Sequence, residues 1–148
     1  MAWNPRSFPA LRPQNHRVTS DPADAYNCVA HAIGSPGVWW WPEEGSYWPE
    51  GLARSESVQT IADAFRQVGY EDCATGEVEA GREKVAIFAD DVGAPTHAAR
   101  QLPSGLWTSK LGPDDDIEHE LDAVAGPLYG QPVRFMSRAV ATEPGRAG

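Results

Sequence analysis

The clearest hydrophobic pattern in the chain lies between residues 55 and 68. Apolar side chains recur there at helical spacing, at Val58, Ile61, Ala62, Phe65 and Val68. Ser55 or Ser57 can cap the first turn, and Gly69 follows the last apolar position. The pattern predicts an amphipathic helix that supports the core.

Shorter apolar runs later in the chain are typical of strands. Residues 84–89 form a dense apolar run suited to a central strand. Residues 96–102 and 106–111 follow as two strands joined through a turn, and residues 133–137 form a last strand. These runs predict a small antiparallel sheet.

Three consecutive aspartates at residues 114–116 precede another apolar pattern. Carboxylates are favourable at the positive end of a helix, so they predict a helix N-terminus. The predicted helix directs Ile117, Leu121 and Val124 inward and ends at Gly126. A calcium loop is the poorer interpretation, because its ligand spacing is missing.

Cys28 lies in a short apolar segment that predicts a further helix. The helix begins either at Asp21, with Pro22 at its first position, or at Asn27, which is also a good cap. Residues 34–37 (Gly-Ser-Pro-Gly) end it. The starting point matters because a thiol in the first turn feels the positive helix terminus, and a thiol two turns later does not.

The chain has 148 residues, enough for one domain with its own core. We expect an extended proline-rich arm at residues 1–20, a single domain at 21–140 and a flexible tail at 141–148. The first 20 residues carry three arginines and no acid, and the remaining 128 then carry 9 − 21 = −12. An acidic body argues against nucleic acid as a partner.

Composition also limits location and cofactors. The sequence has neither a charged-then-apolar leader nor an apolar run near the length of a bilayer span, so we expect a cytoplasmic protein with no membrane partner. Two cysteines, Cys28 and Cys73, are too few for a disulfide framework and too far apart for paired zinc ligands. We expect neither a metal nor a cofactor. The acidic neighbours of Cys73 favour a structural role.

Four of the six tryptophans fall within ten residues, in a segment rich in proline and glycine. One interpretation is a wall for a ligand such as a sugar or peptide. The other is that these rings cover the core, since each buries a large area. The residues concerned are Trp39, Trp40, Trp41, Tyr47 and Trp48.

The chain contains four histidines that could serve Cys28 as a base. His97 begins a predicted strand among alanines, which leave room for the Cys28 helix to pack on it. An imidazole within hydrogen-bond reach can generate a thiolate. We expect His31, three residues after Cys28, to support packing, His16 to lie on the surface of the arm and His119 to lie on a helix surface.

A helix-borne cysteine followed by a strand that begins with histidine resembles the papain-like fold, especially the NlpC-like and CHAP amidases and endopeptidases. Thr96-His97-Ala98-Ala99 matches the histidine strand. The resemblance implies an α+β fold with N-terminal helices packed on a small antiparallel sheet. It also implies a third polar residue on the next strand, which falls at Ser109, or at Lys110 after a one-residue slip; the family usually has His, Asn or Gln there.

The wider pattern also resembles a small bacterial domain family of unknown function. The likeness spans roughly residues 26 to 138 and includes the Asn-Cys pair, the Trp-Pro loop, Glu-Lys-Val-Ala-Ile-Phe and Trp-Thr-Ser-Lys-Leu-Gly.

The papain-like resemblance implies a cysteine-dependent amide hydrolase, whereas the family of unknown function says almost nothing about substrate. Cys28 would attack a peptide or amide carbonyl, His97 would act as base and Ser109 would orient it. Asn27 and the backbone N–H of Cys28 would stabilise the oxyanion, with the tryptophan loop as cleft wall. Acyl transfer or deamidation by the same pair is an alternative.

A binding module that recognises a protein partner through the tryptophan loop is the alternative from another class. A buried Cys28 with His97 turned away would favour it. The natural substrate and the oligomeric state stay open.

Overall fold

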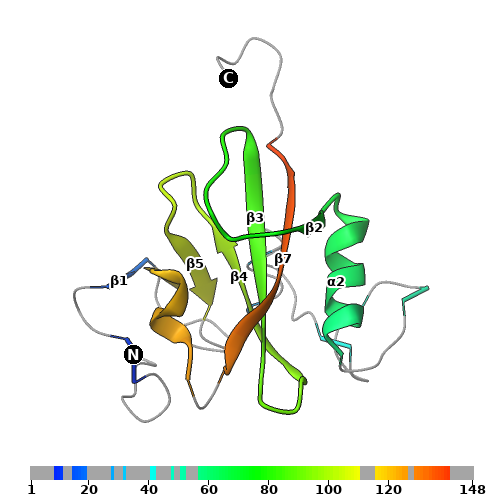
Figure 1. The fold of residues 1–148 in the computed structure, drawn as a ribbon, viewed down its shortest axis with the longest axis horizontal. Coiled ribbons are helices and arrows are strands. Elements are labelled where there is room, and N and C mark those ends of the chain that lie inside the picture. Colours follow the sequence, from blue (N-terminus) through cyan, green and yellow to red (C-terminus); the bar gives the residue numbers. More distant parts are fainter. Residues whose placement is uncertain are drawn as a thin grey trace.

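A seven-stranded antiparallel sheet dominates the computed structural model, with strand order β1-β6-β5-β4-β3-β7-β2 (Figure 1). The structure describes residues 9–11, 15–19, 28, 32, 41–42, 48, 51–52, 57–110, 116–126 and 129–140. The strands are β1 (His16–Val18), β2 (Glu71–Cys73), β3 (Arg82–Ala89), β4 (Pro95–Gln101), β5 (Trp107–Lys110), β6 (Asp116–His119) and β7 (Gln131–Ala139). Among the described residues, the helices with defined bounds are α2 (Val58–Gln67) and a short 3-10 helix, η1 (Leu121–Val124).

The papain-like architecture predicted from the sequence is wrong. That fold packs N-terminal helices on a small sheet, whereas here the sheet has seven strands and the longest helix in the described part of the chain has ten residues. The sheet is larger than expected because β1, from the predicted arm, and β6, from the predicted acidic helix, both join it.

The predicted helix after the aspartates is also wrong. Asp116–His119 is strand β6, and only the short η1 follows it. β6 pairs with β1 on one side and with β5 on the other, so its backbone groups are satisfied by neighbouring strands. This long-range pairing outweighs the local signal of the acidic residues.

The helix expected at residues 55–68 is confirmed as α2. Ser57 is its N-cap, and its hydroxyl accepts a hydrogen bond from the backbone N–H of Thr60 at 3.1 Å. The turn after the helix passes through Gly69, whose φ of +98° favours glycine. The helix buries one face, formed by Thr60, Ile61, Ala62, Ala64 and Phe65.

The two faces of the sheet carry separate cores. The helix face packs against α2 and contributes Val85, Ile87, Ala98 and Met136. Because neighbouring side chains in a strand point to opposite faces, the residues between them belong to the other core. These are Ala86 and Phe88 of β3 and Ala99 of β4.

The other core lies beneath residues 74–80, which connect β2 to β3 and which we name the strap. The strap crosses in front of β3 in Figure 1. Lys84 Nζ donates to the carbonyl of Thr75 at 2.9 Å and to Glu79 at 2.7 Å, and Gln101 Nε2 donates to the carbonyl of Gly76 at 2.6 Å. We call this side of the sheet the strap face.

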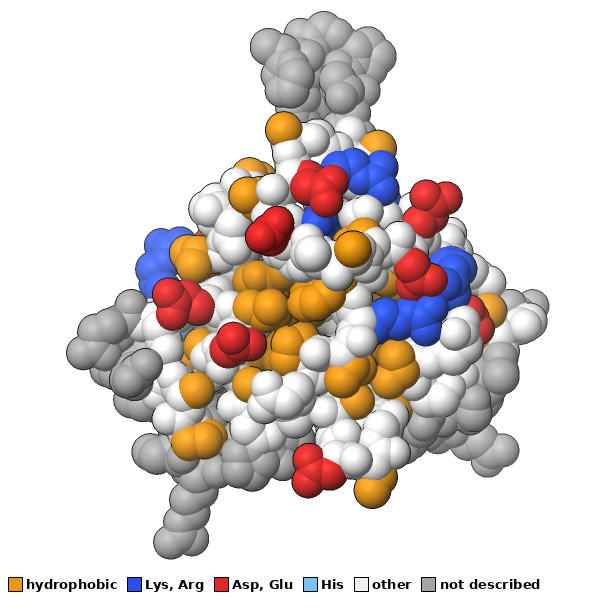
Figure 2. All heavy atoms as spheres, viewed as in Figure 1, with side chains coloured by type: hydrophobic (Ala, Val, Ile, Leu, Met, Phe, Trp, Pro, Cys, Tyr) orange, Lys and Arg blue, Asp and Glu red, His pale blue; other side chains and the backbone are white. Residues whose placement is uncertain are grey.

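Gly76 allows the strap to lie close to the sheet. A Cβ atom there would lie 2.8 Å from the ring of Phe135 and 3.1 Å from the ring of Trp107. In Figure 2, from the same viewpoint, apolar side chains gather at the centre of the strap face, with acidic and basic side chains around them. The strap face therefore shows an apolar centre within a charged margin.

The segment expected as an arm contacts the body at two described places. Leu11 is buried in the strap-face core, and β1 pairs with β6. Arg17 forms an ion pair with Glu118 across these strands at 2.6 Å. Among the described residues, helices are too short or too polar to cross a membrane. The expected tail at residues 141–148 lies outside the described residues.

Candidate functional site

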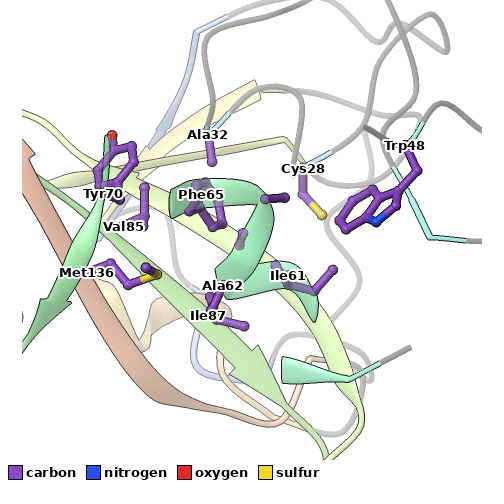
Figure 3. Packing of buried hydrophobic residues seen from close by; sticks show 12 residues of the cluster. Cys28, Ala32, Trp48, Ile61, Ala62, Phe65, Tyr70, Val85, Ile87 and Met136 are labelled. Atoms are coloured by element: carbon purple, nitrogen blue, oxygen red, sulfur yellow. The ribbon is translucent and has the colours of Figure 1, made fainter. Parts of the chain in front are cut away.

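Cys28 is helical and buried, with 6% of its surface exposed. It belongs to the helix-face core together with Trp48, Ile61 and Phe65. In Figure 3 its sulfur points toward the ring of Trp48. Asn27 and His31 lie outside the described residues, so the expected oxyanion contact and the expected packing role are not seen.

The described tryptophans of the loop also contact the helix-face core. Trp48 is 4% exposed, and Trp41 is partly buried against the same cluster. These two rings therefore cover the core, which was one of the two interpretations of the loop. Trp39, Trp40 and Tyr47 lie outside the described residues.

His97 lies on the strap face, where it is 1% exposed. Its ring stacks on Tyr129 with the centroids 4.0 Å apart and meets Phe88 edge-on at 5.3 Å. Both aromatic residues belong to the strap-face core, whereas Ala98, the next residue, belongs to the helix-face core. The structure thus places Cys28 and His97 in cores on opposite faces of the sheet and does not bring them together.

Ser109 does lie beside His97. Its hydroxyl is 2.9 Å from His97 Nε2 and 2.7 Å from Nε2 of His119, so it bridges the two rings. Lys110, the other candidate for the third position, is the next residue and therefore points to the helix face. Lys110 is also fully buried there.

The hydrogen bonds that link His97, Ser109 and His119 have a defined direction. Nδ1 of His119 lies 2.6 Å from the carbonyl oxygen of Glu120, and a carbonyl can only accept, so Nδ1 carries the proton. In the neutral ring, Nε2 of His119 then accepts from the hydroxyl of Ser109. That hydroxyl in turn accepts from Nε2 of His97, which makes His97 a donor at this atom. A base acting through this nitrogen would first have to lose that hydrogen bond.

Burial keeps His119 neutral. Desolvation is the largest cause that lowers the pKa of His119, from 6.5 to about 4; the hydrogen bond to Glu120 opposes it, and the charge of His16 adds to it. The side chain is fully buried. The prediction that His119 lies on a helix surface is wrong, because the residue is buried on strand β6. The alternation of Ile117 and His119 on one side of a short strand was the signal that could have located it.

A cleft opens on the surface near the β1 end of the sheet. Two cavities, of about 630 and 300 Å³, share Asn15, Leu106 and Glu120, and we name the combined space the Leu106 cleft. Its apolar lining includes Trp107, Leu121 and Ala123, and its carboxylates are Glu118, Glu120 and Asp122. Sequence reasoning did not single out this region, because the residues come from the arm, the β4–β5 turn and η1.

The described part of the chain contains no cluster of three or more His, Cys, Asp or Glu side chains suited to a metal ion. The described residues contain two candidate features: the buried hydrogen bonds that link His97, Ser109 and His119 in the strap-face core, and the Leu106 cleft at the surface beside that core.

The comparisons with known proteins give one match. Residues 17–137 match a family described as a domain of unknown function, DUF7689. Because the match covers most of the chain, the chain belongs to this family, in agreement with the second resemblance drawn from the sequence. Neither a curated protein nor a solved structure matches the chain. The comparisons give no support to membership of the papain-like superfamily.

Proposed function

We propose that this member of the family is a binding domain without thiol catalysis, and that the Leu106 cleft receives a cationic peptide segment of a partner protein. The observation that carries the proposal is the cleft itself. It is the meeting of two cavities of about 630 and 300 Å³, with an apolar floor and acidic side chains at its margin. Such a combination of apolar lining and a few polar groups is typical of ligand sites.

The position of Cys28 supports binding over amide hydrolysis or acyl transfer. A thiol nucleophile needs a base within hydrogen-bond reach and access for a substrate. Cys28 is 6% exposed in the helix-face core, and His97 donates its Nε2 proton to Ser109 in the strap-face core. A buried Cys28 with His97 turned away is the arrangement expected for a binding module.

The polar groups of the cleft support a cationic ligand. Glu120 and Asp122 are exposed, and the lining of the larger cavity includes these two acids and, among the described residues, neither lysine nor arginine. The body of the chain outside the first 20 residues carries a net charge of 9 − 21 = −12, which attracts cations from a distance. Arg17 at the margin of the smaller cavity is already paired with Glu118.

The apolar lining supports a lysine-containing segment in particular. Long basic side chains lay their methylene stems along apolar surface and keep the charged end near water or a carboxylate. Leu106 is 40% exposed at the point shared by the two cavities, and Trp107 and Leu121 lie beside it. Recognition through Trp39, Trp40 and Tyr47 stays a separate prediction, since these residues lie outside the described part of the chain.

Fluorescence anisotropy with a labelled octapeptide that alternates lysine and leucine tests the proposal. We expect saturable binding that weakens with added salt, and weakening by about tenfold in the double variant Glu120→Gln, Asp122→Asn, since each exposed charge pair contributes up to about 1 kcal/mol. The control, Glu71→Gln with Asp91→Asn, removes the same charge from exposed sites outside the cleft. Equal binding of a glutamate-leucine counterpart, or equal weakening in the control, would overturn the proposal.

A further inference from the structure

Two buried donor atoms on the helix face have no acceptor among the described residues. They are the hydroxyl of Tyr70 and Nε of Arg100, and neither has a hydrogen-bond partner in the described part of the chain. Tyr70 is 1% exposed, and Arg100 is partly buried. A buried polar group without a partner destabilises a fold, so such groups need an explanation.

The strand register places these two residues around Val85. Arg100 of β4 lies directly opposite Val85 of β3, and directly opposed residues share a face. Val85 belongs to the same core as Tyr70, and Figure 3 shows the two side by side, with the tyrosine hydroxyl directed away from the packed residues. Tyr70 and Arg100 therefore lie on the same face of the sheet, where the charge of Arg100 acts to lower the pKa of Tyr70.

Among the charged groups around Tyr70, Arg100 is the positive group without an acidic partner in the described part of the chain. Arg138 lies over the tyrosine ring, 4.5 Å from its centroid, and its guanidinium forms an ion pair with Glu83. Arg138 also donates to the carbonyl of Val68 at 2.7 Å. Glu83 is thus already paired, whereas Arg100 has no carboxylate within ion-pair distance among the described residues.

We infer that the Tyr70 hydroxyl and the Arg100 guanidinium form a binding site for a carboxylate. A planar carboxylate accepts two parallel hydrogen bonds from a guanidinium edge, and its remaining lone pairs accept from a hydroxyl. Burial, the largest cause, and the charge of Glu83 raise the pKa of Tyr70 to about 12, although Arg138 and Arg100 oppose them, so the hydroxyl keeps its proton for donation. This site is independent of the Leu106 cleft, and the failure of either proposal leaves the other intact.

Thermal unfolding of the full chain in sodium acetate, compared with sodium chloride at equal ionic strength, tests the site. A ligand that binds the folded state raises its stability by mass action, and we expect Tm to rise by about 2–4 °C at an acetate concentration about ten times Kd. The carboxylate that occupies the site could belong to a small free acid or to the C-terminus of a peptide. An N-capped dipeptide with a free C-terminal carboxylate, compared with the same dipeptide amide, tests the second source. A rise with either carboxylate supports the site.

Two variants make the experiment specific. Arg100→Gln should abolish the acetate-dependent rise, and Arg134→Gln, which removes an arginine already paired with Asp72, should retain it. Tyr70→Phe should also abolish the rise while leaving Tm in chloride unchanged or higher, because it removes a buried donor without an acceptor. The site is refuted if acetate gives no rise, if Arg100→Gln keeps the full rise, or if Tyr70→Phe lowers Tm in chloride. A larger rise with phosphate than with acetate would refute the assignment to carboxylates.

Discussion

The two faces of the sheet bury different chemistry. On the helix face, α2 covers aliphatic and aromatic side chains, and Cys28 is one apolar member of that core. On the strap face, the core contains a polar chain from His97 through Ser109 to His119 and on to the carbonyl of Glu120. On the helix face α2 packs on a mainly apolar cluster, whereas on the strap face the margin beside η1 opens to the Leu106 cleft.

This difference teaches how similar residue types acquire different roles. Free cysteine packs as a small apolar residue when an amphipathic helix covers it. Two histidines remain in an apolar core only when their ring nitrogens find partners, and a single serine hydroxyl supplies one partner to each. A pattern of cysteine, histidine and serine can therefore be a catalytic set in one fold and parts of two structural cores in another.

The largest expected effect comes from breaking the polar chain at its centre. Ser109→Ala leaves Nε2 of both histidines buried without the hydroxyl between them, and we expect a loss of about 2–4 kcal/mol in the free energy of unfolding, measured with urea. Ser137→Ala is the matched control, because that buried serine accepts one hydrogen bond, from Arg82. A loss in Ser109→Ala no larger than in the control would show that the bridge contributes little.

The pH dependence of stability tests the neutral state of His119. The folded state holds the pKa of His119 at about 4, below the 6.5 of the unfolded chain, so between these values the unfolded state binds more protons. Stability from this group is complete above pH 6.5 and is lost as pH falls toward 4, by about 2 kcal/mol between pH 7 and pH 5. Urea unfolding across this range measures it.

The variant His119→Gln should remove that part of the pH slope even if it also lowers stability at every pH. His16→Gln, on β1, is the control, and we expect it to keep most of the slope because burial, and not the charge of His16, is the largest cause of the lowered pKa of His119. An unchanged slope in His119→Gln would mean that this histidine does not titrate between the two values.

The last prediction concerns the reactivity of the thiol on the helix face, and we expect it to involve little change in stability. Iodoacetamide should label Cys73, on the edge strand β2 and partly exposed, faster than Cys28, by about tenfold or more, because a buried thiol reacts only after local opening. Mass spectrometry of the labelled peptides measures the labelling of each cysteine. The single variants Cys28→Ala and Cys73→Ala confirm which peptide carries which label. Rapid labelling of Cys28 at neutral pH would instead favour the thiol nucleophile expected from the sequence.

Several elements of the fold were predictable because their signals are local. Helical spacing and the Ser57 cap located α2, and the apolar runs located β3, β4, β5 and part of β7. The contact between His97 and Ser109 was expected only from the papain-like resemblance, and it is present although the fold that the resemblance implied is wrong. Whether these residues act on a substrate is a separate matter that their contact does not decide.

Other elements were not predictable because distant segments determine them. β6 begins at the last of three aspartates typical of a helix start, yet it is a strand that pairs with β5 and with β1, about 100 residues earlier. The same pairing buries His119 instead of exposing it on a helix. The Leu106 cleft brings together Asn15, Leu106 and Glu120, which no local pattern connects.

The sequence by itself determined the amphipathic helix, the central strands and the acidic charge of the body, since each depends on spacing or composition within a short stretch. Only the tertiary structure decided which face of the sheet each side chain meets. Because successive residues of a strand point to opposite faces, the placement of α2 on one face separated Cys28 from His97. The same geometry left Ser109 between two buried histidines.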